Sequence, residues 1–297
     1  MSFRLLLGEL MSRIDPQIID WYEKKTPQIL QRYGGHGPRV HYHTGVLPSD
    51  VDLNAALEAP LEVLSQQLFA AQERLLEQAF ARWGADAAIG GEVIDVGCGL
   101  GGTSIYLAQR FGARVTALTP VPAHAKLVQR FASEAAVGPL VSPEVGDAHT
   151  VAGLARFDQA VCLGAANYFD RTVWFAQLRQ LLRARGDVFI EDIFAGRPDS
   201  IAAFNRYWRS NLGPESDYIQ AAHAAGFALV SRVDNTREAG RFWRLTLAHS
   251  MRQLALGGLE PAERADRERA IAYHEEMFAR YQDGGFSNLL LHFRRMD

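Results

Sequence analysis

The residues best suited to binding chemistry lie in a glycine-rich stretch that opens with an acid. It reads Asp95-Val-Gly97-Cys98-Gly99-Leu-Gly101-Gly102. Glycine adopts backbone conformations that other residues avoid, and it lets a ligand approach the main chain closely. An acid at the start of such a loop attracts a cation and repels a phosphate group. The stretch therefore predicts a site for a small ligand with a positively charged, amino-acid-like end.

Two elements must hold this loop, a strand before it and a helix after it. The run from Glu92 to Val96 is apolar and contains β-branched residues, which predicts a buried strand. The residues from Thr103 to Phe111 have the apolar spacing of a helix packed on a sheet. Strand, glycine loop and helix form the opening unit of a doubly wound α/β nucleotide-binding domain.

A dinucleotide site is the alternative, because Gly97, Gly99 and Gly102 also fit the G-x-G-x-x-G pattern. Two residues argue against it. Asp95 stands where the pyrophosphate would lie, and it would repel that group. The next predicted strand ends at Thr119, whereas a dinucleotide site places Asp or Glu about twenty residues on to bind the ribose.

The stretch resembles the D-x-G-C-G-x-G-G motif of the class I S-adenosylmethionine-dependent methyltransferases. The resemblance implies that S-adenosylmethionine is the cofactor and that Asp95 and the glycine loop hold its methionine part. It also implies that Asp147 bonds the adenine amino group and that the Ala148 amide meets the ring. Thr119 replaces the common acid, as in subgroups similar to cyclopropane fatty acid synthases and prenyl C-methyltransferases. The implied cofactor-binding residues are Asp95, Gly97, Cys98, Gly99, Gly101, Gly102, Thr119, Asp147, Ala148 and Leu163.

The chain of 297 residues is long enough for one α/β domain with added helices. We expect a Rossmann-like doubly wound sheet of seven strands, with the last strand antiparallel. Residues 1–87 are predicted as a helical segment that covers the active site, and residues 88–297 as the core, with helical cap insertions at about 196–225 and 236–283. The predicted strands are 92–96, 114–118, 140–146, 157–163, 186–192, 227–233 and 286–293. The predicted helices are 16–33 with a kink or break at Thr26-Pro27, 51–83, 103–111, 123–135, 174–182, 216–225, 236–256 and 261–281.

Charge, hydropathy and cysteine content limit the partners and the cellular compartment that we expect for this protein. The net charge of -3 and the lack of a basic stripe exclude a nucleic-acid partner. The apolar run at the start is too short to cross a membrane and lacks a secretory cleavage pattern. Cys98 and Cys162 fall in predicted core segments, so a reducing cytoplasm is expected rather than a disulfide framework. We expect a homodimer, since two-fold dimers are the commonest assembly.

The acceptor is predicted to be methylated on carbon. Attack by an alkene or an indole creates a cation, which aromatic faces and a carboxylate can stabilise. Tyr22, Tyr168 and Glu191 come from segments that can converge on one pocket, and His43 lies in a partial match to a motif that closes over the site in related enzymes. Gly164-Ala-Ala follows the fourth strand where many relatives carry an acid, which removes one candidate base. The predicted helix that contains Tyr-Glu-Lys-Lys-Thr (residues 22–26) and the His-Tyr-His-Thr-Gly segment (residues 41–45) resemble bacterial specialised-metabolism C-methyltransferases. These include enzymes that act on indole alkaloids and on terpenoid precursors, and a small indole-type acceptor is favoured.

Three other functions are open. A prenyl diphosphate C-methyltransferase would need cations for the diphosphate. An N- or O-methyltransferase would use His43 or His41 as its base. A non-catalytic cofactor sensor is disfavoured by the intact glycine motif. The two histidines lack a third ligand nearby, so no metal site is predicted. The arginines proposed for a diphosphate are Arg39, Arg206, Arg209, Arg241 and Arg244.

Overall fold

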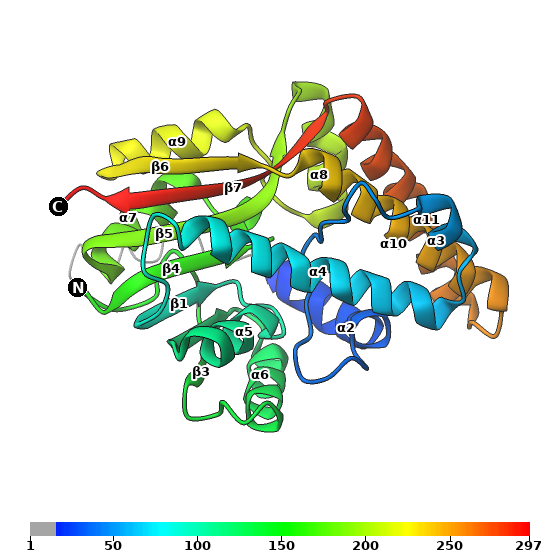
Figure 1. The fold of residues 1–297 in the computed structure, drawn as a ribbon, viewed down its shortest axis with the longest axis horizontal. Helices are drawn as coiled ribbons and strands as arrows, with labels where there is room; N and C mark the ends of the chain where they lie inside the picture. Colours follow the sequence, from blue (N-terminus) through cyan, green and yellow to red (C-terminus); the bar gives the residue numbers. More distant parts are fainter. Residues whose placement is uncertain (1–15) are drawn as a thin grey trace.

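A seven-stranded sheet forms the centre of the computed structural model, which describes residues 16–297 (Figure 1). The strand order is β3-β2-β1-β4-β5-β7-β6, and β7 runs antiparallel to both of its neighbours. The predicted fold class, with its antiparallel last strand, is confirmed. The strands are β1 (Glu92–Val96), β2 (Arg114–Thr119), β3 (Val141–Val145), β4 (Phe157–Leu163), β5 (Leu182–Ala195), β6 (Phe227–Asp234) and β7 (Phe286–Arg295).

Helices cover both faces of the sheet because its central strands are apolar on both sides. Val93 of β1 packs with α4 and α5, whereas Ile94, the next residue, packs with α7 and α9. Because successive side chains of a strand point to opposite faces of the sheet, β1 contributes to two hydrophobic cores. The helices around the sheet are α4 (Leu61–Trp83), α5 (Gly102–Phe111), α6 (Pro122–Glu134), α7 (Arg171–Leu181) and α9 (Glu215–Ala224).

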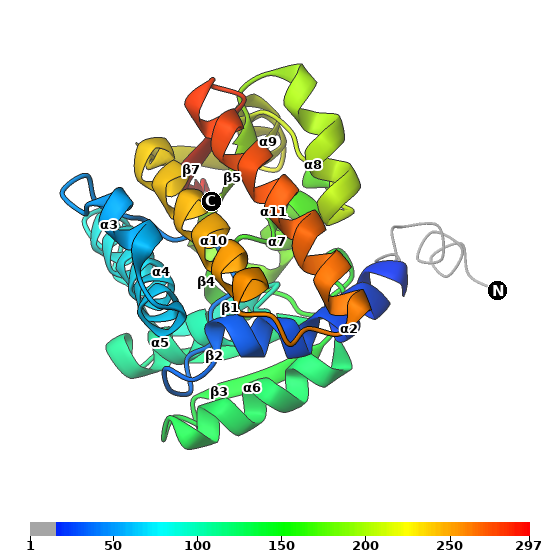
Figure 2. The ribbon, with the colours of Figure 1, turned by 90° about the vertical axis from the view of Figure 1, so that its right-hand side faces the viewer.

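A second group of helices stands beyond one end of the strands (Figure 2). Here α2 (Pro16–Tyr33) lies with α10 (Thr236–Leu256) and α11 (Pro261–Gln282), and α8 (Ile201–Trp208) lies close by. The predicted cap insertions contain α8 and α9, and then α10 and α11. The proposed boundary at residue 87 stays a prediction, and the apolar start of the chain lies outside the described residues.

The structure refines two helix predictions. Of the kink or break expected at Thr26-Pro27, the break does not occur, because α2 continues through Pro27; the Thr26 hydroxyl bonds back to the carbonyl of Tyr22, a contact that bends helices without ending them. The helical region expected over residues 51–83 consists of two helices, α3 (Leu53–Glu58) and α4. Pro60 lacks the N–H that would continue α3, and it begins α4 instead.

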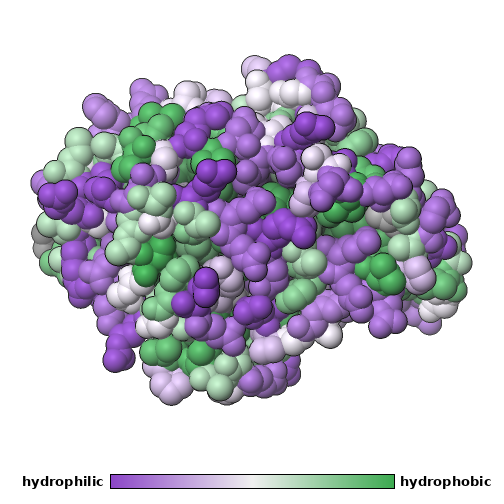
Figure 3. All heavy atoms as spheres, in the orientation of Figure 1, coloured by the Kyte–Doolittle hydropathy of each residue, from purple (hydrophilic) through white to green (hydrophobic). Residues whose placement is uncertain are grey.

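The surface shown in Figure 3 is mostly polar, with apolar residues in small separate areas. Within residues 16–297, no helix is long and apolar enough to cross a membrane.

Candidate active site

The carboxyl ends of β1 to β4 surround a cavity of about 290 Å³, here named the sheet-edge cavity. Open α/β sheets bind their ligands at this edge. Each strand delivers one part of the lining: the glycine loop after β1, Thr119 at the end of β2, Gly146 and Ala148 after β3, and Leu163 at the end of β4. Residues predicted from separate parts of the sequence therefore meet at one site.

The space around the glycine loop differs from one glycine to the next. Gly97 has a φ of +75°, and a Cβ there would lie 2.5 Å from the Cβ of Ala165. A Cβ on Gly99 would meet nothing within 4 Å, so this residue leaves open space for a ligand. Gly101 is not among the described residues that line the cavity, and it is the N-cap residue of α5.

Asp95 is buried at the cavity wall and accepts a hydrogen bond from the Ser104 hydroxyl at 2.5 Å. Burial raises the pKa of this carboxyl to about 7, although the hydrogen bonds from Ser104 oppose the shift. A buried carboxylate gains most from a cation placed beside it. Asp95 is thus suited to an ammonium group.

The turn after β3 presents its backbone to the cavity. Asp147 accepts hydrogen bonds from both the amide and Nδ1 of His149, at 2.9 and 2.7 Å. The Asp170 amide donates to Nε2 of His149, so Nδ1 carries the proton of a neutral ring. Ala148 and His149 line the cavity, while Asp147 stands just behind it. The predicted adenine contact of Asp147 stays a prediction.

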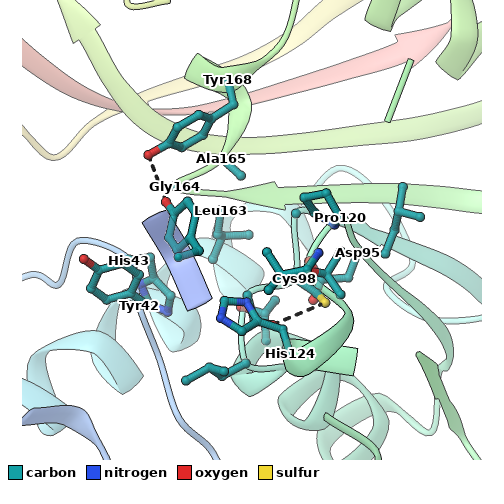
Figure 4. A pocket seen from close by; sticks show the side chains of 18 of the residues that line it. Tyr42, His43, Asp95, Cys98, Pro120, His124, Leu163, Gly164, Ala165 and Tyr168 are labelled. Atoms are coloured by element: carbon teal, nitrogen blue, oxygen red, sulfur yellow. Dashed lines mark hydrogen bonds between the residues drawn. The ribbon is translucent and has the colours of Figure 1, made fainter. Parts of the chain in front are cut away.

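A loop from the amino-terminal region, residues 40–44, packs on Gly102 through Val40 and His41 and closes the cavity. Figure 4 shows Tyr42 and His43 across the cavity from Asp95 and Cys98. The loop is fastened to α4, because Glu73 accepts from Nε2 of His41 at 2.6 Å and also pairs with Arg39. The Gln72 amide donates to the carbonyl of His43 at 2.8 Å. Gln72 and Glu73 thus hold the loop, a role that the spacing of their helix did not indicate.

His43 is poorly suited to act as a base. Its Nδ1 donates to the carbonyl of Thr44 at 2.7 Å, which leaves Nε2 as the unprotonated nitrogen. That nitrogen is buried and has no hydrogen-bond partner within residues 16–297. Burial, with a further contribution from His41, lowers the pKa of His43 to about 3. The ring therefore resists taking up a proton.

A second cavity, of about 110 Å³, adjoins the first and is named the helix cavity. Tyr22, Tyr42, His43, Gly164 and Tyr168 line both cavities, so the two meet at these residues. The Tyr22 hydroxyl donates to that of Tyr168 at 2.8 Å, and this bond crosses the junction (Figure 4). The predicted convergence of the two tyrosines thus has a structural counterpart, whereas their catalytic role stays a prediction.

Aromatic side chains, here named the aromatic wall, and charged side chains together line the helix cavity. The aromatic wall comprises Phe204, Tyr207, Trp208, Phe242 and Trp243. The charged side chains of its lining are Lys25, Arg32, Asp192, Asp266 and Arg267. Such a mixture suits a ligand that is apolar at one end and charged at the other.

Positive charge is in excess around Lys25, Arg32 and Arg267. Both arginines are only 8% exposed. Arg32 donates to the Ser250 hydroxyl at 2.7 Å, and Nε of Arg267 is buried without a hydrogen-bond partner in the described part of the chain. Burial first, and then Arg32, lower the pKa of Arg267 to about 10. Asp266, 3.7 Å from Lys25, offsets part of this charge, so the cluster is suited to bind an anion.

The arginines proposed from the sequence for a diphosphate are a different set, and their role stays a prediction. None of the five lines either cavity in the described structure. Arg39 pairs with Glu73, Arg209 donates to Gln17, and Arg241 donates to the carbonyls of Leu47 and Val51. The sequence lists every arginine alike, whereas the fold buries Arg32 of α2 and Arg267 of α11 together in the helix cavity.

At the end of β5, the acid that faces a cavity is not Glu191, the one expected from the sequence. Of the described residues, Glu191 lines neither cavity, and it accepts a hydrogen bond from Asn288 at 2.6 Å. Burial and then Asp192 raise the pKa of Glu191 to about 8. Asp192 lines the helix cavity instead. Successive strand residues point to opposite faces, so only one of the two acids can face the cavity.

No three His, Cys, Asp or Glu side chains within residues 16–297 come together to hold a metal ion.

Comparison with known proteins agrees with this geometry. Residues 93–186 match the family model described as a methyltransferase domain. The chain is 25% identical over 285 residues to the geranyl diphosphate 2-C-methyltransferase of Streptomyces lasalocidi, a match that covers 91% of this chain and 86% of that protein. It is also 25% identical over 168 residues to a probable chloroplastic tocopherol O-methyltransferase of rice (Oryza sativa subsp. japonica), which covers 51% of this chain but only 46% of the rice protein.

Solved structures share the fold over nearly the whole chain. The geranyl diphosphate C-methyltransferase of Streptomyces coelicolor A3(2), solved with Mg²⁺, geranyl-S-thiolodiphosphate and S-adenosyl-L-homocysteine, superposes with a TM-score of 0.79 at 20% identity. The superposition covers 96% of this chain and 99% of that one. Residues 93–186 thus form a methyltransferase domain, and the described chain has the fold of the class I S-adenosylmethionine-dependent methyltransferases. Within that class its relatives belong to the branch that acts on small molecules.

Proposed function

We propose that this enzyme transfers the methyl group of S-adenosylmethionine to an alkene carbon of a prenyl diphosphate. The observation that carries the proposal is the pair of buried arginines, Arg32 and Arg267, with the partly exposed Lys25 beside them, in a cavity that adjoins the sheet-edge cavity. Asp192 and Asp266 balance only part of this positive charge, and a bound diphosphate would neutralise the rest. The aromatic wall beside them suits the prenyl chain.

The residues that line the sheet-edge cavity match the parts of S-adenosylmethionine. Asp95 would take the ammonium group, and the open space at Gly99 leaves room beside the loop for the methionine part. Thr119 and the backbone at Ala148 line the part of the cavity where the nucleoside is expected. The bound cofactor supplies a methyl group already activated by its sulfonium. Tyr22 and Tyr168, at the junction, would then hold the acceptor in line with that methyl group.

An indole acceptor, favoured by the sequence, has less support. An indole carries no anion, so it would leave the cations at Arg32 and Arg267 uncompensated. The named activity of the Streptomyces relatives also supports the prenyl diphosphate. N- or O-methylation with His43 as base is disfavoured because burial opposes protonation of that ring.

Transfer of a labelled methyl group tests the proposal. Purified enzyme would receive labelled S-adenosylmethionine with dimethylallyl diphosphate or geranyl diphosphate, each with and without Mg²⁺. The matched alcohols, which lack the diphosphate, and an indole would serve as controls. We expect label in a diphosphate and little in the alcohols. Label in the indole or the alcohols, with none in any diphosphate, would refute the proposal.

Three further predictions accompany this function. The setting is proposed to be bacterial specialised metabolism in the cytoplasm, and the buried free thiols of Cys98 and Cys162 suit a reducing compartment. A homodimer is also proposed. Sedimentation at several protein concentrations would test the dimer.

A further inference from the structure

Carbon methylation leaves a cation, and the end of β4 offers no carboxylate to receive its proton. Gly164 occupies that position with a φ of +66°. A Cβ there would lie 3.2 Å from the Cβ of His43, because the loop of residues 40–44 packs directly on it. Figure 4 shows these residues side by side. The left-handed backbone and the close packing of His43 both disfavour a side chain at this position.

Asp192 is the carboxylate that the helix cavity presents at the sheet. It is 4% exposed and lies at the carboxyl end of β5. Oδ1 accepts from the Asn167 side chain at 2.8 Å and from the Ile193 amide at 2.7 Å. Oδ2 accepts a longer bond, 3.2 Å, from the Asn167 amide, and the Ala166 backbone also donates to this carboxylate. Oδ2 has the longer of the measured contacts and is the oxygen that we expect to meet a new partner.

Asn167 fixes the orientation of this carboxylate. The hydroxyl of Tyr218 donates to Oδ1 of Asn167 at 2.9 Å, so the amide nitrogen must face Asp192 and the carbonyl of Ile193. Tyr218 comes from α9 and Asn167 from the 3₁₀ turn η1 (Ala166–Tyr168). Three elements therefore hold Asp192 in one position.

Besides the charged side chains of the helix cavity, Lys25, Arg32, Asp266 and Arg267, the ionisable groups on which Asp192 acts are neutral at pH 7. They come from α2, β4, η1, α9 and α11, together with its neighbour on β5. They are Tyr22, Cys162, Tyr168, Tyr218, Tyr281 and Glu191. Burial raises the pKa of each of them, and it raises the pKa of Asp192 itself to about 6. Asp192 is then the one negative charge within this described group at pH 7.

We propose that Asp192 stabilises the cation formed in the helix cavity and then accepts its proton. This inference rests on the proposed prenyl diphosphate C-methylation. The π electrons of the alkene form a bond to the methyl carbon while the sulfur–carbon bond breaks, and its electron pair stays on sulfur. The neighbouring carbon becomes cationic. A C–H bond next to that carbon then gives its electrons back to an alkene, and its proton goes to Oδ2 of Asp192.

Two adjacent acids allow a matched test, because Asp192→Asn and Glu191→Gln remove carboxylates on opposite faces of one strand. With saturating cofactor and diphosphate, we expect Asp192→Asn to lower kcat by roughly a hundredfold or more, as for loss of a positioned base. Glu191→Gln should stay within a few-fold of wild type. Asp192→Glu, which keeps a carboxylate, should recover part of the rate. Circular dichroism and S-adenosylhomocysteine affinity would verify that each variant folds.

A deuterium isotope effect separates proton transfer to Asp192 from a role of Asp192 in positioning alone, which would leave that effect unchanged. With an acceptor deuterated at the carbon that loses its proton, we expect a primary isotope effect or a diverted product in Asp192→Asn but not in Glu191→Gln. If Asp192→Asn fails to fold, wild-type kcat should still fall about tenfold per pH unit below about 6. A flat profile from about pH 5 to 8, or an unchanged rate and product in folded Asp192→Asn, would overturn the inference alone. Failure of wild type to methylate any prenyl diphosphate would remove the proposed function and this inference together.

Discussion

The two cavities differ in what builds them and in the sign of their charge. The sheet-edge cavity is formed largely by strand ends and by the loops that follow them, with a buried acid, Asp95. The helix cavity is formed mainly by side chains from α2, α8, α10 and α11, and its excess charge is positive. A cofactor with a cationic end and an acceptor with an anionic end would thus be sorted electrostatically, each to its own side of the Tyr22–Tyr168 junction.

The largest effect should come from removing the positive charge of the helix cavity. We expect Arg32→Ala combined with Arg267→Ala to raise the acceptor KM at least about a hundredfold, since each charged hydrogen bond contributes about 1.5–3 kcal/mol. The measurement is steady-state kinetics with the diphosphate acceptor. Cofactor affinity should be unchanged, and Arg264→Ala, an exposed arginine on α11, is the matched control. Equal losses of cofactor and acceptor binding would break the proposed division of charge.

The reciprocal change is Asp95→Asn in the sheet-edge cavity. Loss of one charged contact should weaken S-adenosylhomocysteine binding by roughly 10- to 100-fold, while acceptor KM stays near wild type. Calorimetric titration measures the first quantity and kinetics the second. Ser104→Ala, which removes the hydroxyl donor to Asp95, serves as a milder control. Wild-type cofactor affinity in Asp95→Asn would show that the cation binds elsewhere.

Acceptor length should produce a smaller effect. The helix cavity holds about 110 Å³, less than a cavity of about 150 Å³ that binds benzene. We therefore expect dimethylallyl diphosphate to exceed geranyl diphosphate in kcat/KM by about tenfold. Trp208→Ala, which widens the aromatic wall, should reduce or reverse this preference. If geranyl diphosphate is the better substrate of the wild type, the cavity must open on binding.

The pH dependence of cofactor binding should change by several-fold. Burial raises the pKa of Asp95 to about 7, so the carboxyl is increasingly protonated below that pH and cannot pair with an ammonium. Affinity for S-adenosylhomocysteine should therefore fall as the pH drops from about 8 to about 6, and Asp95→Asn should remove that dependence. The sign for stability is opposite. A raised folded pKa contributes stability at low pH that is lost as the pH rises through about 7, so the cofactor-free protein should unfold at a lower temperature at pH 8 than at pH 6.

The sheet-edge cavity could be predicted because its parts are local in the sequence. An apolar run, a glycine loop and Asp95 stand next to one another, and the parallel sheet then brings Thr119 and Ala148 to the same edge. The cations of the helix cavity could not be predicted in this way. Arg32 and Arg267 are 235 positions apart, and only the packing of α2 with α11 makes them neighbours.

The choice between Glu191 and Asp192 shows a narrower limit. Both acids follow each other at the carboxyl end of the strand predicted over residues 186–192, but a shift of one residue in strand register reverses which one faces the cavity. The pairing of β5 with β7 sets that register, since Glu191 lies opposite Leu290 and Asp192 opposite Leu289. The residue type was thus predictable, whereas its orientation depended on a strand almost a hundred residues away.

The ion pair that fastens the loop of residues 40–44 has a consequence for turnover. Arg39 is 31% exposed where it meets Glu73, so dissolved salt can weaken this attachment. Weaker attachment should speed the lifting of the loop and the departure of the spent cofactor, while the same salt screens the attraction between the diphosphate and Lys25. Ionic strength would then act on the two ends of the catalytic cycle in opposite directions. We expect added salt to lower kcat/KM for the acceptor and, where cofactor release limits turnover, to raise kcat at saturating acceptor.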